Sequence, residues 1–283
     1  MTSATPTLAQ ALAQAHTLGL ARIDAQLLLL HTLARPDAGR AWLLAHDTDA
    51  LDEGAHGQFI ALCQRRLAGE PVAYLTGRKE FYGLPLQVDA RVLDPRPDTE
   101  TLVEWALEVI APLASPRVVD LGTGSGAIAL ALQSQRADAQ VLAVDASADA
   151  LAVAQANAKR LGLPVQFQQA NWLADVEGPF DAIISNPPYI ASADPHLAAL
   201  THEPLQALAS GADGLEDIRT IVAQAPAHLQ PGGWLLLEHG YDQAEAVQAL
   251  LATQGFALVQ SRNDLAGIAR CSGGQWPLAQ TVK

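Results

Sequence analysis

The stretch Ser185-Asn186-Pro187-Pro188-Tyr189 combines residue types that could hold a flat polar group. It follows residues 180–184, an apolar run that predicts a buried strand. The Asn186 amide can donate and accept hydrogen bonds, and the two prolines stiffen the loop. Tyr189 adds an aromatic face. The stretch suits a planar –NH2 group, but Asn-Pro also commonly opens a rigid turn, so the motif alone leaves both interpretations open.

A second candidate lies in the glycine-rich segment Asp120-Leu121-Gly122-Thr123-Gly124-Ser125-Gly126, between a predicted strand and a predicted helix. Asp145 ends the next strand, about 20 residues further on, where an acid typically bonds ribose hydroxyls. A dinucleotide site is one interpretation. However, the glycines follow G-x-G-x-G and not the G-x-G-x-x-G of the dinucleotide fingerprint.

The carboxylate of Asp120 narrows the choice of ligand. A negative charge beside the loop would repel a pyrophosphate. It would favour a ligand that carries positive charge, such as the sulfonium and ammonium groups of S-adenosylmethionine. Asp120 could also cap the glycine loop structurally, and both roles can hold together.

Two further pairs of polar and aromatic residues follow predicted strands. Asn171-Trp172 comes after residues 165–169, where Asn could bond the exocyclic amine of adenine and Trp could pack on its ring. Trp172 could equally be an ordinary core aromatic. Glu238-His239 ends the strand at residues 234–238, and we interpret that pair as structural.

The elements that must position these residues alternate between strand and helix from Arg117 onward. This alternation predicts an α/β fold with a mostly parallel sheet covered on both faces. Residues 256–260 and 268–271 are the last two strands, and their proximity predicts an antiparallel edge. We also expect a helix over residues 102–110, capped by Asp98 or Thr99, and a helix over residues 218–229.

The N-terminal part has a different character. Apolar residues recur at helical spacing from residue 7 to about 70, with Thr7 as a candidate cap, and no strand is indicated. Aromatic and apolar residues around Gly83 predict a hairpin. The expected organisation is a helical substrate-docking domain at 1–75, a β-hairpin linker at 76–98 and a catalytic domain at 99–283.

Composition limits the class of protein. Hydrophobic residues make up 49% of the 283 residues, which is enough for a large core, and the net charge is −13. That charge argues against wrapping duplex DNA, where many phosphates need Lys and Arg. Cys63 and Cys271 have no metal-ligand spacing, so no metal is expected. Neither a signal peptide nor an apolar membrane-length run is evident, so we expect a cytoplasmic protein with no membrane partner.

Together, the Asp120–Gly126 loop, Asp145 and Asn186-Pro187-Pro188-Tyr189 resemble class I S-adenosylmethionine-dependent methyltransferases that modify planar amines. Further motifs are similar to the release factor glutamine methyltransferases, the PrmC (HemK) family. They are Glu80-Phe81-Tyr82-Gly83-Leu84-Pro85, Pro95-Arg96-Pro97-Asp98-Thr99-Glu100, Asp194-Pro195-His196-Leu197, Glu203-Pro204, Leu236-Leu237-Glu238-His239-Gly240 and Asp264-Leu265-Ala266-Gly267. The resemblance spans essentially the whole chain. Asp94 departs from it, since the family usually has an aliphatic residue there.

The resemblance implies a Rossmann-like sheet and methylation of the glutamine amide in the Gly-Gly-Gln motif of class I peptide-chain release factors. S-adenosylmethionine would be the cofactor, and no direct nucleic-acid contact is expected. The implied catalytic residues are Asn186, Pro187 and Tyr189. The implied cofactor-binding residues are Asp120, Gly122, Thr123, Gly124, Gly126, Asp145, Asn171, Trp172 and Asn186. The implied substrate-binding residues are Asn186, Pro187, Pro188, Tyr189, Arg96 and Pro97.

Two alternatives come from other classes of protein. The first is a nucleic-acid methyltransferase acting on an exocyclic base amine, with the flipped base stacked on Tyr189. The acidic balance and the lack of a basic stripe in residues 1–75 argue against it. The second is a non-enzymatic nucleotide-binding or scaffolding protein, for which an intact Asn-Pro-Pro-Tyr loop is not needed.

Overall fold

The computed structural model describes residues 5–278. The chain divides into two compact units, Met1–Arg78 and Lys79–Lys283. Within the described part of the chain, none of the helices combines the length and the apolar character that a membrane span requires. The finer division at residues 75 and 98, with a separate linker and a docking role for the helices, stays a prediction.

The first unit is helical, as predicted. Thr7 forms a capping box with Gln10 at the start of α1, and buried leucines together with Phe59 form the core. The short helix α5 follows Pro71 and was not predicted, because five residues are too few to show helical periodicity. The helices are α1 (Leu8–Thr17), α2 (Arg22–Thr32), α3 (Arg40–Ala45), α4 (Glu53–Leu67) and α5 (Val72–Thr76).

The second unit is built on a seven-stranded sheet with the order β5-β4-β3-β6-β7-β9-β8. Strands β5, β4, β3, β6 and β7 are parallel, and β9 runs antiparallel to both β7 and β8, which confirms the predicted parallel sheet with an antiparallel edge. The strands are β3 (Arg117–Leu121), β4 (Gln140–Asp145), β5 (Gln166–Gln169), β6 (Phe180–Ser185), β7 (Leu229–Glu238), β8 (Ala257–Asn263) and β9 (Ala269–Gln275). The predicted hairpin is β1 (Arg78–Phe81) and β2 (Leu84–Gln87).

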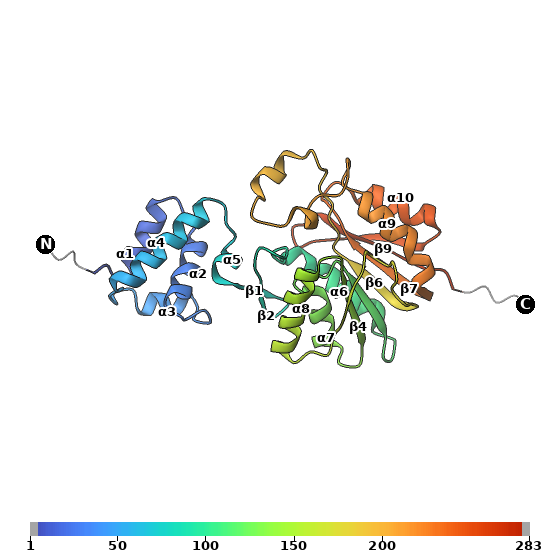
Figure 1. The fold of residues 1–283 in the computed structure, drawn as a ribbon, viewed down its shortest axis with the longest axis horizontal. Coiled ribbons are helices and arrows are strands. Elements are labelled where there is room, and N and C mark those ends of the chain that lie inside the picture. The colour runs from blue at the N-terminus through green and yellow to red at the C-terminus, as the bar shows by residue number, and fades with distance from the viewer. Residues whose placement is uncertain (1–4, 279–283) are drawn as a thin grey trace, which may run out of the picture. The chain divides into compact units, whose positions relative to one another are not determined.

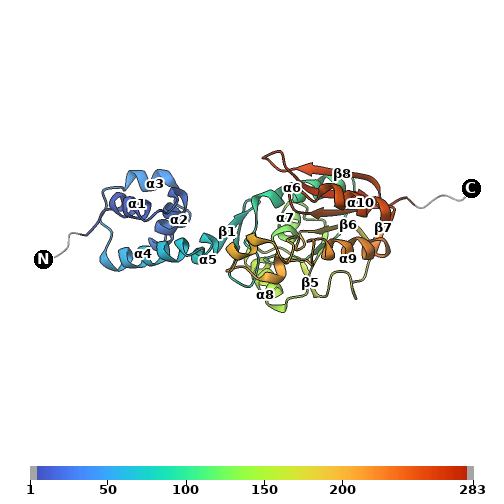
Figure 2. The ribbon, with the colours of Figure 1, turned by 90° about the horizontal axis from the view of Figure 1, so that it is seen from above.

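Helices cover both faces of this sheet (Figure 1). One face carries α6 (Glu100–Ile110), α7 (Ala127–Gln135) and α8 (Ala148–Leu161), and the other carries α9 (Glu216–Gln224) and α10 (Ala244–Gln254). Figure 2 shows the same layers from above. The central strands β3 and β6 are nearly continuous apolar runs because both of their faces are buried.

Two details of the helices differ from the sequence-based expectation. A 3₁₀ turn, Pro97–Thr99, leads into α6, and no side chain caps that helix. The prediction that Asp98 or Thr99 caps it was therefore wrong, and the Thr99 hydroxyl has another use described below. Helix α9 ends at Gln224 and continues as a 3₁₀ turn, Ala225–His228, because Pro226 has no N–H for a helical hydrogen bond.

Candidate active site

Four predicted motifs meet at one edge of the sheet. Strands β5, β4, β3 and β6 are adjacent and parallel, so their carboxyl ends lie together, and ligands of open α/β sheets bind beyond this edge. A hollow of about 230 Å³ lies there. The predicted site residues that line it are Gly122, Gly124, Asp145, Asn171, Trp172, Asn186 and Pro188.

The glycine loop turns tightly between β3 and α7. Gly122 and Gly126 have φ angles of 70° and 84°, in the left-handed region that favours glycine. A Cβ on Gly122 would lie 3.3 Å from the Trp172 ring, and one on Gly126 would lie 3.0 Å from Leu130. Glycine at these positions therefore lets the loop pack closely, and Gly122 leaves backbone open to the hollow.

Asp120 lies beneath the loop and is completely buried. Its Oδ2 accepts hydrogen bonds from Thr123 Oγ1 at 2.6 Å and from the Ala129 N–H at 3.2 Å. Burial raises the pKa of Asp120 to about 7, although these two hydrogen bonds lower it. Its Oδ1 has no partner among the described residues. Asp120 thus holds the loop and keeps one buried acceptor oxygen unused.

Asp145 connects the loop to the end of β4. Its Oδ2 accepts from the Gly124 N–H and its Oδ1 from the Ser147 N–H, both at 2.9 Å. Burial raises the pKa of Asp145, and the backbone hydrogen bonds lower it. An ionised carboxylate has about four acceptor sites, so further lone pairs remain for hydroxyl groups of a ligand.

The Asn171-Trp172 pair forms another wall of the hollow. Trp172 has a φ of 52°, an uncommon conformation for a bulky residue, and its Nε1 donates to Asp217 Oδ1 at 3.1 Å. Trp172 also packs against the main core cluster, so it is both a core aromatic and a lining residue. Asn171 is exposed at the rim.

The Asn-Pro-Pro-Tyr loop is anchored from below. Asn186 Nδ2 donates to Thr99 Oγ1 at 3.2 Å, and the Tyr189 carbonyl accepts from Gln243 Nε2 at 3.0 Å. Burial, with the nearby Glu238 charge, raises the pKa of Tyr189, so its hydroxyl stays protonated at neutral pH. Asn186 and Pro188 line the hollow, whereas Pro187 and Tyr189 do not.

Arg96 and Pro97 do not line this hollow. The Arg96 Nη2 donates to Glu203 Oε1 at 2.6 Å, and Asp94 lies 3.8 Å from the same guanidinium. Pro97 is exposed and opens the turn that carries Thr99. Substrate contacts by Arg96 and Pro97 stay a prediction.

Two residues that sequence reasoning missed are Thr99 and Asp217. Thr99 precedes Asn186 by 87 residues, and Asp217 follows Trp172 by 45 residues. No local spacing connects either pair, and Thr99 has the residue type and position of a helix cap. Only the packing of α6 and α9 onto the sheet brings these groups to the site.

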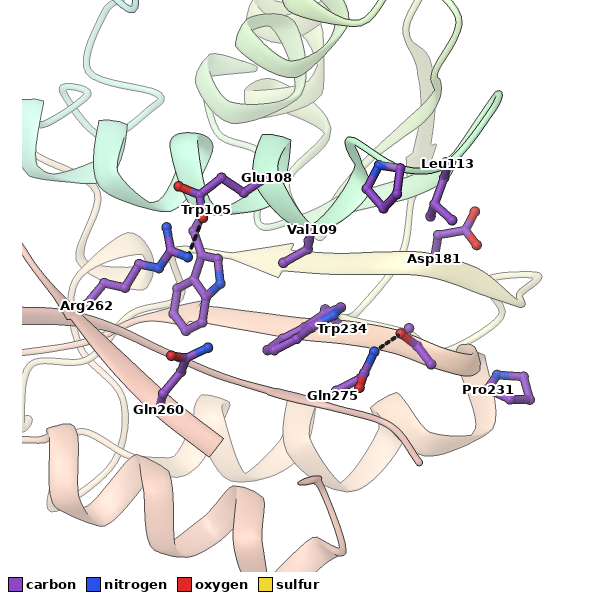
Figure 3. Close-up of a pocket in the computed structure, with 13 residues that line it drawn as sticks. Trp105, Glu108, Val109, Leu113, Asp181, Pro231, Trp234, Gln260, Arg262 and Gln275 are labelled. Carbon is purple, nitrogen blue, oxygen red and sulfur yellow. Dashed lines mark hydrogen bonds and ion pairs between the residues drawn. The ribbon is translucent and has the colours of Figure 1, made fainter. Parts of the chain in front are cut away.

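A wider hollow, of about 440 Å³, lies elsewhere in the same unit. It includes Asp181 and Trp234, which stand near the amino end of β6 and beside it on β7, away from Asn186. Figure 3 shows Arg262 stacked on Trp105 and paired with Glu108 in this hollow. No predicted site residue lines it, so it is not the site that the motifs form.

Comparison with known proteins defines the class. The model of the methyltransferase small domain matches residues 98–213. A methyltransferase from Pyrococcus furiosus is 19% identical, with a TM-score of 0.53 over 76% of this chain and 98% of that chain. The hMettl16 catalytic domain is 16% identical, with a TM-score of 0.57 over 82% of this chain and 84% of that chain. At these identities the likeness is one of fold. The fold and the glycine loop define a class I methyltransferase.

Closer relatives define the family. The PrmC N-terminal domain model matches residues 7–77. The release factor glutamine methyltransferase of Burkholderia pseudomallei is 48% identical over 90% of this chain and 92% of that protein. That of Bordetella pertussis is 50% identical over 90% and 95%, and that of Xylella fastidiosa strain Temecula1 is 50% identical over 94% and 98%. The chain belongs to the release factor glutamine methyltransferase family.

Proposed function

We propose that this methyltransferase uses S-adenosylmethionine to methylate the side-chain amide nitrogen of the glutamine in the Gly-Gly-Gln motif of class I peptide-chain release factors. One observation carries the proposal beyond family membership. Asn186, whose amide can accept from an –NH2 group, lines the same hollow as Gly122, Gly124 and Asp145. The acceptor for a planar amine and the nucleotide-binding elements thus share one site.

The residues around the hollow fit S-adenosylmethionine. Asp145 would accept from the ribose hydroxyls, the Gly122 and Gly124 backbone would lie against the methionine part, and Trp172 would border the adenine. The unpaired Asp120 Oδ1 is the feature that favours a cationic ligand over a pyrophosphate, because a nearby cation would favour the ionised carboxylate whereas a pyrophosphate would disfavour it. When bound, S-adenosylmethionine supplies an electrophilic methyl group.

The protein's contribution to the chemistry is positioning. An amide nitrogen is a poor nucleophile because its lone pair is delocalised into the carbonyl. We infer that Asn186 Oδ1 and the Pro187 carbonyl accept from the two N–H groups, while Tyr189 packs on the glutamine. This arrangement aims the nitrogen and stabilises the positive charge that develops on it. Precise orientation of this kind can supply about 7–11 kcal/mol, and the released proton passes to solvent.

We further propose that the helical unit docks the release factor and that the enzyme acts in the cytoplasm. Three of its six arginines are engaged locally, since Arg65 pairs with Glu70, Arg66 with Asp24 and Arg78 with Asp37. Docking therefore depends on the surface of the unit as a whole and not on one free basic patch.

The test uses purified protein, methyl-labelled S-adenosylmethionine and three acceptors: a class I release factor, the same factor with its Gly-Gly-Gln glutamine replaced by alanine, and DNA or RNA. We expect label in the native release factor alone, located on the glutamine by mass spectrometry. Label in nucleic acid alone would overturn the proposal and revive the base-amine alternative. Equal label in both release factors would place the methyl group on another residue.

A further inference from the structure

The side chain of Asn186 is held from within the protein. Its Nδ2 donates to the Thr99 hydroxyl oxygen at 3.2 Å, and Thr99 is 4% exposed. A side-chain amide can rotate by half a turn with little change in shape, exchanging its donor for its acceptor. Only one of the two orientations presents Oδ1 to an –NH2 group. The partner below the amide therefore decides whether Asn186 can serve as an acceptor.

Beneath Thr99 lies the carboxyl of Glu238. Glu238 follows Leu237, which pairs with Ser185, so it stands next to Asn186 across the β6–β7 ladder. Its side chain is almost fully buried, and the hydroxyls of Thr99 and Tyr189 lie close enough to the carboxyl to lower its pKa by hydrogen bonding. Its Oε2 has no partner among the described residues. One buried carboxyl therefore contacts both ends of the Asn-Pro-Pro-Tyr loop, directly at Tyr189 and through Thr99 at Asn186.

Counting protons fixes the direction of each hydrogen bond. An ionised carboxylate only accepts, so the Thr99 hydroxyl must give its single proton to Glu238. The Thr99 oxygen then has only lone pairs to offer Asn186, and it must meet the Nδ2 donor. Oδ1 is left for the cleft. With a neutral carboxylic acid or an amide at position 238, the Thr99 hydroxyl can accept from below and donate above, and Asn186 is free to turn over.

We propose, on the basis of the proposed function, that Glu238 and Thr99 are positioning residues that lock the Asn186 amide with Oδ1 toward the methyl-accepting nitrogen. Neither residue touches the substrate in this arrangement. Glu238 sets the direction of the Thr99 hydroxyl, and Thr99 sets the orientation of Asn186. The Tyr189 hydroxyl interacts with the same carboxyl, so Glu238 also positions the Tyr189 ring.

Protonation of Glu238 would release this lock. Burial raises the pKa of Glu238 to about 7, and the Thr99 and Tyr189 hydrogen bonds lower it. Arg270, which also lowers that pKa, is itself paired with Asp264 at 3.2 Å. The titratable or charged groups that face Glu238 from the neighbouring elements are Asp98, Tyr189, Arg270 and Cys271.

The first test requires no methyl acceptor. The ¹⁵N and ¹H resonances of the Asn186 side-chain amide, assigned by their loss in Asn186→Asp, are followed as the pH is lowered from 8.5 to 5.5, as a rough working range around the raised pKa. We expect them to shift with the ionisation of Glu238 in the native protein and in the control Asp120→Asn, but not in Glu238→Gln. Resonances that titrate equally in Glu238→Gln would overturn the proposal, whether or not release factors prove to be the substrate.

The second test measures methyl transfer at saturating cofactor. Glu238→Gln and Thr99→Val should each lower kcat about tenfold or more, the scale seen when groups that orient a functional ligand are removed. Thr99→Ser keeps the hydroxyl and should keep near-native kcat. The double variant should be no slower than the slower single variant, because both changes break one chain of hydrogen bonds.

Stability and cofactor binding distinguish a positioning role from a purely structural one, which would lower both. If Glu238 is a positioning residue, Glu238→Gln should be as stable as the native protein or more stable, because a buried charge whose pKa is raised has been removed, and its cofactor Kd should be unchanged. The acid limb of the native kcat–pH profile should also be absent from this variant. If Glu238→Gln kept native kcat and the acid limb, the proposal would be wrong. If the native protein left release factors unlabelled, only the proposed function would fail, and the resonance titration would still decide the role of Glu238.

Discussion

Two hollows of the catalytic unit differ in position and in lining, and the predicted site residues line the smaller of them. The wide hollow, about 440 Å³, lies near the amino ends of β6 and β7, and the narrow one, about 230 Å³, lies at the carboxyl ends. Several polar groups of the wide hollow are paired within it: Arg262 pairs with Glu108, and Gln275 Nε2 donates to the Gly232 carbonyl at 2.9 Å. The buried Trp105 Nε1, a donor, has no partner among the described residues.

The narrow hollow differs in the kind of polar capacity left over, which consists of acceptors and not of a donor. Asp120 below it keeps one oxygen without a partner, and Asp145 has lone pairs beyond its two backbone contacts. Asn186 gives its donor to Thr99 and so keeps its acceptor for the cleft. Unused acceptors at the ends of strands, which can meet the hydroxyl and amine donors of a ligand, therefore distinguish this hollow better than volume does. Substitutions matched between the two hollows test this difference.

The largest effect is expected for Asn186→Ala. Loss of the acceptor removes an interaction that strengthens as charge develops on the amide nitrogen, so kcat should fall about a hundredfold or more. The cofactor Kd, measured by calorimetry, should stay near its native value. The matched change in the wide hollow, Gln260→Ala, should leave kcat unaltered. Equal losses of kcat and cofactor affinity in Asn186→Ala would contradict the placement of Asn186 at the acceptor.

Asp145→Asn should act on cofactor binding. Hydrogen bonds to a charged group are worth about 1.5–3 kcal/mol, so the cofactor Kd should rise about tenfold or more. At saturating cofactor the loss of kcat should be much smaller. Glu108→Gln makes the same chemical change in the wide hollow and should not alter the Kd. An unchanged Kd in Asp145→Asn would remove Asp145 from the cofactor site.

The buried carboxylate under the narrow hollow should cost stability at neutral pH. The folded-state pKa of Asp120 is raised to about 7 from an ordinary value of 3.8. Between those values the folded protein binds more protons than the unfolded chain, so the stability contribution of Asp120 is lost as the pH rises. In urea unfolding, the free energy of unfolding of Asp120→Asn minus that of the native protein should increase from roughly pH 4 to pH 7 and should stay constant above this range.

That comparison uses the difference between two proteins because His239 acts in the opposite direction. Burial lowers the pKa of His239, so its contribution to stability increases as the pH rises toward its ordinary value. His239 is present in both proteins and cancels from the difference. If the difference in unfolding free energy between Asp120→Asn and the native protein stayed constant with pH, Asp120 would be ionised throughout this range.

The sequence predicted the residues that line the narrow hollow better than the residues that hold them in place. Asp145 and Asn186 are recognisable because each ends an apolar strand, and parallel strands must bring their carboxyl ends together. Thr99 could not be assigned, because its partner Asn186 lies far away in the chain and a helix start offered a local explanation. Arg96 was placed in the cleft by resemblance, whereas its pairing with Glu203 depends on tertiary packing. The wide hollow has no local signature, since it arises between α6 and the antiparallel edge.

The smallest effect is expected for Arg262→Ala in the wide hollow. Its partly exposed pair with Glu108 and its stacking on Trp105 should together be worth about 1 kcal/mol of unfolding free energy. Methyl transfer and cofactor binding should be unaltered, because Arg262 lines the wide hollow, which none of the predicted site residues lines. Arg262→Lys keeps the charge but not the planar stacking, and should lose about half of that stability. A loss of kcat in Arg262→Ala without a loss of stability would show that the two hollows are coupled, and would contradict the distinction between them.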